Sequence, residues 1–211
     1  MNDDKWAYDG NDECAVFFTE CRKRAAHLMP IEPDNHILEV GCSEFDWLTE
    51  ADRCWPMTQF TGIDQRCENP GEDRQGVYRI KADILTWPSP WCLFDGVVAI
   101  STMEHIGLGH YGDPIDPEGD IVAMRRIADW VKPGGWFYFD VPYDPTGYRI
   151  YKGTKCRVYD DATILSRLWS PTWRREWIGW APQRFVKDLI LDRPTINVEP
   201  FWYVGQVWRR R

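Results

Sequence analysis

Three acidic residues give the first chemical signal in this sequence, because each one comes at or near the end of a short apolar run. Glu39 is followed by Gly41, Asp64 lies about 23 residues beyond that glycine, and Asp83 follows a third run. An acid at this distance from a glycine turn can accept hydrogen bonds from ribose hydroxyls. A further acid on the next strand could accept from the exocyclic amine of a base. Together the three acids predict a nucleoside-binding site.

A second group of reactive side chains lies in residues 103–120, which hold two histidines, several carboxylates and four glycines. An imidazole with an ordinary pKa suits a general base that takes a proton from a hydroxyl. We expect His105 to be this base, with His110 as the second choice. Glu104 could orient the base or hold the substrate hydroxyl, or the Glu104-His105 pair could simply close the ligand pocket.

The same loop also allows a metal-binding interpretation. His105 and His110 together with Asp113 and Asp116 could hold a divalent cation that acidifies a hydroxyl. Aspartates next to prolines, however, more often cap turns than bind metals. We therefore predict no metal site and keep the cation as the alternative.

The elements that must position these residues alternate between strand and helix. Continuous apolar runs such as Ile37, Leu38 and Val40 are typical of strands that are buried on both faces. Pro117 to Val131 shows the spacing of an amphipathic helix and ends at Lys132-Pro-Gly-Gly135. Strands are expected at residues 36–40, 58–63, 77–80, 94–100, 136–141, 173–180 and 201–208, and helices at 12–29, 43–53, 117–131, 160–169 and 183–191. A polar, turn-rich loop is expected at 69–76.

This order predicts an α/β fold with a Rossmann-like, mostly parallel sheet of seven strands, helices on both faces and a C-terminal antiparallel hairpin. At 211 residues the chain fits a single domain. Within it we expect an N-terminal helical segment (1–35), a ligand-binding core (36–141) and a substrate-side part (142–211).

The composition of the chain argues against some kinds of binding partner. The net charge of -8 argues against sequence-independent binding of nucleic acid, which needs a basic face. The seven cysteines are scattered and odd in number, and no apolar run approaches the ~18 residues of a membrane span. We therefore expect a cytoplasmic protein with reduced thiols that does not bind membranes. Its aromatic-rich C-terminal strands could pack in the core, form a homodimer or stack on a substrate.

In residues 36–141 the chain resembles the class I S-adenosylmethionine-dependent methyltransferases. Five segments resemble the motifs of that family, in order and at its spacing: 36–42, 62–64, 81–84, 94–105 and 131–135. The resemblance implies S-adenosylmethionine as the cofactor and methyl transfer as the activity. It also implies a role in cofactor binding for the following residues: Glu39, Gly41, Cys42 and Ser43 at the methionine end, Asp64 at the ribose, Asp83 and Ile84 at the adenine, and Ser101 with Thr102 beneath the sulfonium.

One turn departs from the family pattern, because Ser43 and Phe45 stand where the family usually has glycines. This departure leaves two alternatives to a methyltransferase. The chain could be a non-catalytic nucleoside-binding or scaffold protein, or an enzyme that uses the cofactor without methylating.

The loop at 103–120 also resembles one in a poorly characterised group of small bacterial methyltransferase-like proteins. That resemblance implies a small-molecule acceptor, with an oxygen of a sugar or related metabolite as the atom that is methylated.

Overall fold

The computed structural model describes seven stretches of the chain: residues 29–42, 47–67, 70–74, 77–90, 92–151, 155–180 and 202–211. Three sequence-based predictions lie outside these stretches. They are the helix at 12–29 apart from its last residue, the departure at Ser43 and Phe45, and the helix at 183–191.

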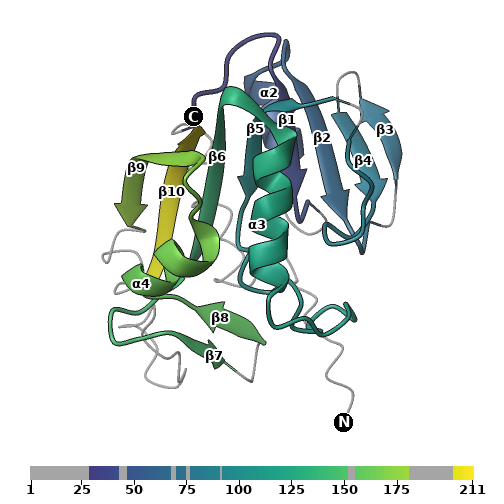
Figure 1. Cartoon of the computed structure of the whole chain (residues 1–211). Helices are drawn as coiled ribbons and strands as arrows, with labels where there is room; N and C mark the ends of the chain where they lie inside the picture. Colours follow the sequence, from purple (N-terminus) through teal and green to yellow (C-terminus); the bar gives the residue numbers. More distant parts are fainter. Residues whose placement is uncertain are drawn as a thin grey trace, which may run out of the picture.

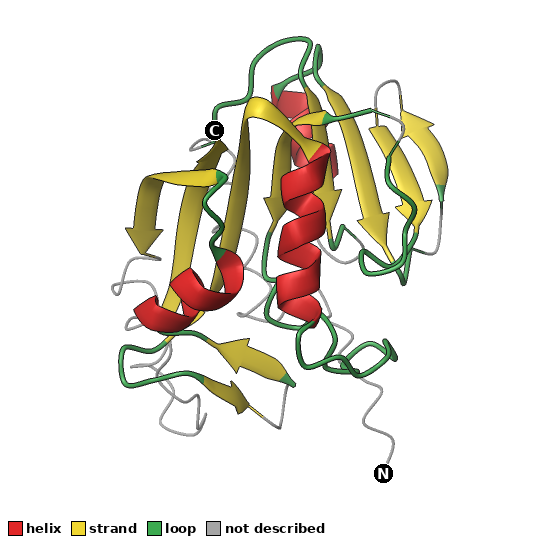
Figure 2. Cartoon of the chain, in the orientation of Figure 1, coloured by secondary structure: helices red, strands yellow, loops and turns green. Residues whose placement is uncertain are grey.

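The centre of the molecule is an eight-stranded sheet with the order β3-β4-β2-β1-β5-β6-β10-β9 (Figures 1 and 2). The five strands from β4 to β6 in this order run parallel to one another, whereas β3, β9 and β10 pair in the antiparallel sense. The strands are β1 (His36–Val40), β2 (Gln59–Asp64), β3 (Gly71–Arg74), β4 (Val77–Lys81), β5 (Phe94–Ala99), β6 (Val131–Tyr143), β9 (Trp173–Trp180) and β10 (Trp202–Arg210).

The predicted fold class is confirmed, with one strand more than expected. β3 is an antiparallel edge strand, and it lies where a turn-rich loop was predicted. The prediction was wrong there because the sequence Gly-Glu-Asp-Arg has no apolar residue, and an edge strand can form from polar residues by backbone pairing alone.

The helices cover both faces of the sheet, as predicted. In Figure 1, α3 (Gly119–Trp130) lies in front of the sheet and α2 (Trp47–Cys54) behind it. Each helix packs on its own apolar core: Ala123, Met124 and Ile127 belong to one cluster, and Leu48 and Ala51 to the other. The pleat explains this division, since neighbouring strand residues point to opposite faces.

The buried face of α3 differs from the one that the apolar spacing suggested. Asp120, Ala123, Met124 and Ile127 are buried, whereas Ile121 is only half-buried. The helix therefore turns a carboxylate toward the protein interior, and this carboxylate needs partners there.

The C-terminal part adds the predicted antiparallel pair β9 and β10 to the sheet. Trp173 and Trp208 are fully buried in the core, which favours the packing role for these two aromatic residues. A small second sheet of β7 (Arg149–Tyr151) and β8 (Cys156–Val158) was not predicted. It is followed by the short helix α4 (Asp161–Thr163) and the π-helical turn η1 (Ile164–Leu168).

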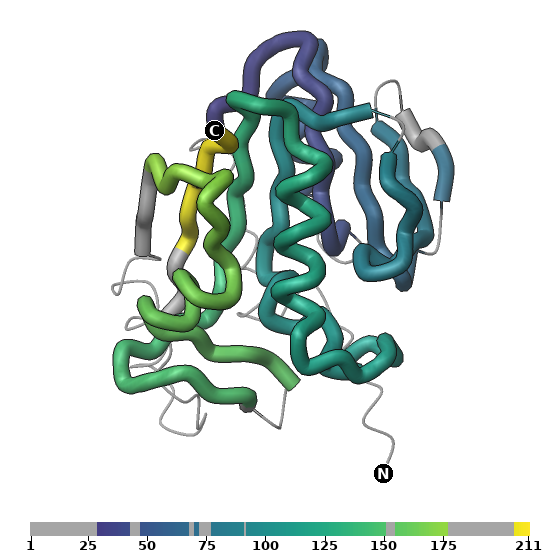
Figure 3. Tube along the Cα trace, in the orientation of Figure 1, coloured from purple at the N-terminus to yellow at the C-terminus, as the bar shows by residue number. Residues whose placement is uncertain are grey.

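Figure 3 follows the chain from β6 through the β7–β8 hairpin to η1 and shows that the hairpin lies at the same end of the molecule as the loop before α3. Within the described stretches, no helix is both long enough and apolar enough to cross a membrane.

Candidate functional site

The residues singled out from the sequence gather at the carboxyl end of the parallel strands. The arrowheads of β2, β4 and β5 in Figure 1 point toward the end of the sheet where the loop before α3 lies. Neighbouring strands place Gly41, Asp64, Asp83 and Ser101 just beyond or at this edge, because β1 pairs with β2 and β5, and β2 pairs with β4. Ligands of open α/β sheets bind at this edge.

The turn after β1 has little space. Gly41 has a φ of 85°, and its backbone N–H donates to the carbonyl of Ile63 at 2.8 Å. A Cβ atom on Gly41 would lie 2.3 Å from Oγ1 of Thr102. Both the left-handed backbone and the close approach require glycine here.

Two predicted cofactor residues flank this glycine. Glu39 is 3% exposed, so it is a carboxylate buried at the rim of the sheet. Cys42 is also buried, and burial followed by the nearby charge of Glu39 raises the pKa of its thiol. Cys42 is therefore a neutral thiol in this site, and Ser43 lies outside the described residues.

Asp64 and Asp83 each use one carboxyl oxygen to cap the turn that follows its strand. Oδ1 of Asp64 accepts from the backbone N–H of Arg66 at 2.7 Å, and Oδ1 of Asp83 accepts from that of Leu85 at 2.8 Å. Ile84 is buried and belongs to the same apolar cluster as Ala123, Met124 and Ile127. A carboxylate can accept several hydrogen bonds at once, so capping a turn is compatible with accepting from a ligand hydroxyl or amine as well.

The turn after β5 is held by two carboxylates. Ser101 has a φ of 47°, which is uncommon outside glycine. Its backbone N–H donates to Oδ1 of Asp140 at 2.7 Å, and its hydroxyl donates to Oε1 of Glu104 at 2.9 Å. Glu104 is completely buried, so it serves to hold this turn as well as to neighbour His105.

His105 lies beside Glu104, with its Nε2 3.9 Å from Oε1 of that residue. Its Nδ1 is 3.2 Å from the carbonyl oxygen of Lys155. Burial, followed by the electrostatic effect of His110, lowers the pKa of His105 to about 4. The side chain is still 15% exposed, so a neutral imidazole is accessible near neutral pH.

His105 also belongs to a stack that joins two loops. The rings of His105 and His110 stack with centroids 4.8 Å apart, and Tyr111 meets the His110 ring edge-on at 4.3 Å. The guanidinium of Arg66 lies 3.6 Å from the centre of the Tyr111 ring, in a cation–π contact. Because Arg66 belongs to the turn capped by Asp64, the stack connects the predicted ribose site with the predicted base.

The aspartates of the metal-binding alternative serve the loop itself. Asp113 accepts from the backbone N–H groups of Gly109 and Tyr111, and Asp116 accepts from that of Glu118. The described residues contain no cluster of three or more side chains suited to a metal ion. The structure therefore favours turn-capping roles for both aspartates.

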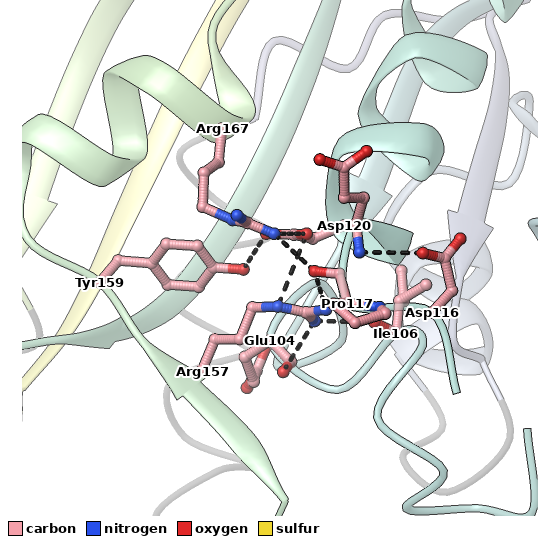
Figure 4. Close-up of polar contacts among 9 residues, drawn as sticks. Glu104, Ile106, Asp116, Pro117, Asp120, Arg157, Tyr159 and Arg167 are labelled. Atoms are coloured by element: carbon pink, nitrogen blue, oxygen red, sulfur yellow. Dashed lines mark hydrogen bonds and ion pairs between the residues drawn. The ribbon is translucent and has the colours of Figure 1, made fainter. Parts of the chain in front are cut away.

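A buried ionic network that the sequence reasoning missed holds this loop in place (Figure 4). Arg157 of β8 is fully buried and lies 3.5 Å from Oδ1 of Asp120 at the start of α3. Asp120 also accepts two hydrogen bonds from Arg167, at 2.7 and 2.8 Å, and one from Tyr159 at 2.9 Å. One sequence signal pointed to it, since Asp120 lies three, four and seven residues before the buried Ala123, Met124 and Ile127.

The lowered pKa of His105 predicts a pH effect on stability. Its ordinary pKa is 6.5, so between pH 6.5 and 4 His105 is protonated in the unfolded chain and neutral in the folded protein. The free energy of unfolding is therefore unaffected by this histidine above pH 6.5, and it falls by up to about 3 kcal/mol as the pH is lowered from 6.5 to 4. Urea unfolding of the wild type and of His105→Gln at pH 7, 5.5 and 4.5 measures it. We expect a smaller loss of stability in His105→Gln; parallel losses would contradict the assigned environment.

Comparisons with known proteins support the fold more strongly than any particular activity. Residues 85–164 match the family described as "Caenorhabditis protein of unknown function, DUF268". This segment contains the loop at 103–120 together with Arg157 and Tyr159. No curated protein matches the chain.

Many solved structures are similar to the chain. The cyclase SpnF matches with a TM-score of 0.68 and 15% identity, over 97% of this chain and 86% of its own. The putative methyltransferase solved with the Haloferax volcanii Trm112 methyltransferase activator matches with a TM-score of 0.68 and 17% identity, over 97% of this chain and 96% of its own. The N-methyltransferase NodS from Bradyrhizobium japonicum WM9, solved with S-adenosyl-L-homocysteine, matches with a TM-score of 0.62 and 17% identity, over 100% of this chain and 93% of its own.

At these identities the likeness concerns the fold alone. The chain has the fold of the class I S-adenosylmethionine-dependent methyltransferases, as the motifs predicted. The closer resemblance to a group of small bacterial proteins stays a prediction.

Proposed function

We propose that this chain is an S-adenosylmethionine-dependent methyltransferase that acts on a small-molecule acceptor. The observation that carries the proposal is the turn at Gly41, where a left-handed glycine lies against Thr102 next to the buried carboxylate of Glu39. This turn lies at the carboxyl end of a parallel sheet, where Glu39 and Asp64 lie near the ends of neighbouring strands. Two carboxylates beside a glycine turn suit a ligand that carries an ammonium group and a ribose.

The residues present fit this cofactor. Glu39 and the turn at Gly41 and Cys42 would hold its amino acid end, where Ser43 is also predicted to bind, and Asp64 would accept from the ribose hydroxyls. Asp83 and Ile84 would flank the adenine, the first by accepting from its amine and the second by apolar contact. Ser101, fixed by Asp140 and Glu104, would lie near the reacting centre.

S-adenosylmethionine supplies a methyl group that its sulfonium has already activated for displacement. The task of the chain is therefore to orient the acceptor and to remove its proton. His105 is the proposed base, because its ring lies beside the buried carboxylate of Glu104 in the turn that follows β5 and is still partly exposed. Its lowered pKa keeps the ring neutral at physiological pH and makes it a weaker base than an ordinary imidazole. The proton would pass to Nε2, and the charge of the resulting imidazolium would be stabilised by Glu104, whose Oε1 lies 3.9 Å away. His110, stacked on the ring, is the second candidate.

We propose an oxygen of a sugar or related metabolite as the acceptor atom. A neutral imidazole beside a buried carboxylate supports this choice, since a hydroxyl must lose its proton as it is methylated. The structural neighbour NodS is named an N-methyltransferase, so amines belong in the same assay. Transfer of labelled methyl to a panel of sugars and matched amino sugars would separate the two.

His105→Gln is expected to keep cofactor affinity within about twofold while turnover falls by about 100-fold or more, in line with the loss of a general base. Calorimetry with S-adenosylhomocysteine measures the first quantity and a methyl-transfer assay the second. His36→Gln is the matched control, because His36 lies at the amino end of β1 and should affect neither. Unchanged turnover in His105→Gln would remove His105 from the base role.

A further inference from the structure

The unprotonated nitrogen of a neutral histidine decides whether the ring can act as a base from a given side. Nδ1 of His105 is 3.2 Å from the carbonyl oxygen of Lys155. A carbonyl can only accept a hydrogen bond, so the proton of the neutral ring must be on Nδ1. Nε2 then holds the lone pair, on the side of the ring that neighbours Glu104.

The carbonyl of Lys155 depends on an unusual backbone. Lys155 has a φ of 45°, a left-handed conformation that is unfavourable for a residue with a side chain. Its ammonium group donates to the carbonyl of Gly109 at 2.9 Å, so the same residue contacts the loop at two points. Such strain persists where the surrounding structure holds it, and it often marks a functional position.

Arg157 extends this contact two residues further along the chain. Its backbone N–H donates to the carbonyl of Glu104 at 2.9 Å. Its guanidinium donates to the carbonyls of Ile106 at 2.7 Å, Pro117 at 3.2 Å and Glu104 at 3.4 Å. The carbonyls of the residues before and after His105 are thus both bound by one buried side chain, whose charge Asp120 balances.

We infer that Lys155 and Arg157 are positioning residues for the reaction: they hold His105 as the Nδ1–H tautomer, so that Nε2 is the nitrogen that takes the acceptor's proton. The inference rests on the proposed role of His105 as the base, and nothing in the sequence motifs assigns it. Arg157 fixes the backbone around the ring, and Lys155 fixes the proton on the ring.

The tautomer can be measured without any acceptor. In protein labelled with ¹⁵N-histidine, two-bond ¹H–¹⁵N correlation spectra at pH 7.5 distinguish a protonated from an unprotonated ring nitrogen. His105→Gln assigns the His105 signals by their disappearance. We expect a protonated Nδ1 and an unprotonated Nε2 in the wild type. A His105 ring protonated on Nε2 would overturn the inference.

Two substitutions of Lys155 form a matched pair. Lys155→Gly and Lys155→Val both remove the contact with Gly109, but only glycine retains the left-handed backbone without strain. We expect Lys155→Gly to keep the wild-type tautomer and Lys155→Val to shift His105 toward the Nε2–H form. An unchanged tautomer in folded Lys155→Val, or its loss in Lys155→Gly, would overturn the inference.

The outcome separates this inference from the proposed function. If the tautomer follows Lys155 as expected but His105→Gln still methylates at the wild-type rate, the ring is held as described and the base role fails. A different tautomer in the wild type would defeat the positioning role whatever the activity of the enzyme.

Discussion

Replacing Gly41 by alanine is expected to weaken binding of S-adenosylhomocysteine by at least about 100-fold, which corresponds to ~3 kcal/mol. The new Cβ would lie 2.3 Å from Oγ1 of Thr102, on a residue whose φ is 85°. Thr102 cannot easily move away, because its hydroxyl donates to the carbonyl of Ile100 at 2.8 Å. The turn must shift instead, and it would shift where the cofactor is proposed to bind.

Gly134→Ala is the control for this experiment. Gly134 has a φ of 79°, but nothing lies within 4 Å of a Cβ placed there, and it belongs to the turn at the amino end of β6. Both variants should lose roughly 1–2 kcal/mol to left-handed strain, and Gly41→Ala should lose more because of its contact with Thr102, as thermal unfolding will show. Only Gly41→Ala should lose cofactor affinity. Equal affinities in the two variants would contradict the proposed site.

The second large effect is expected at Arg157. Arg157→Met should lower the free energy of unfolding by about 3 kcal/mol or more, since removing one partner of a buried ion pair leaves polar groups without compensation. The carbonyl of Ile106 would lose its hydrogen bond from the guanidinium, and the carbonyls of Glu104 and Pro117 would each lose one of two donors. Asp120 would lose one of its two guanidinium partners. Urea denaturation at pH 7 measures the change.

Arg149→Met provides the comparison for Arg157→Met. Arg149 pairs with Asp144 at 2.6 Å, but both side chains are partly exposed, at 33% and 13%. Pairs of this kind contribute about 0–1 kcal/mol. If the two variants lost similar stability, the network around Asp120 would not be the anchor that the structure indicates.

The parallel half of the fold could be predicted because buried strands have a simple signature. Runs such as Ile37, Leu38 and Val40, or residues 94–100, are apolar on both faces of the sheet, and each was placed within about a residue of its observed bounds. The strands β3, β7 and β8 were missed because they are only three or four residues long, too short for alternation or an apolar run to indicate a strand.

The candidate site was predictable to the extent that its residues follow strands. Gly41, Asp64 and Ser101 come directly after or at the end of their strands, so the topology alone gathers them at one edge. The contact of His105 with Lys155 spans 50 residues, and that of Arg157 with Glu104 spans 53. No local spacing encodes contacts of this range, which depend on how the β7–β8 hairpin packs against the loop.

The helix α3 was predicted correctly, but its buried face was not. Its apolar spacing indicated a helix, but the apolar residues Ile121 and Val122 are only half-buried. A carboxylate in register with Ala123, Met124 and Ile127 indicates a buried acid, and a buried acid implies a cation elsewhere in the chain. In this protein the cations are the guanidinium groups of Arg157 and Arg167.

The proposed cofactor site is tested most directly by titrating S-adenosylhomocysteine into the wild-type protein in a calorimeter. The variants Asp64→Ala and Asp129→Ala are titrated in parallel. Asp64 is buried at the end of β2, whereas Asp129 is exposed on α3. Losing two hydrogen bonds to a carboxylate is worth about 3 kcal/mol, or roughly 100-fold in affinity. We predict binding by the wild type and Asp129→Ala and a loss of this size in Asp64→Ala. No heat with the wild type, or equal affinity in Asp64→Ala, would contradict the proposed cofactor site.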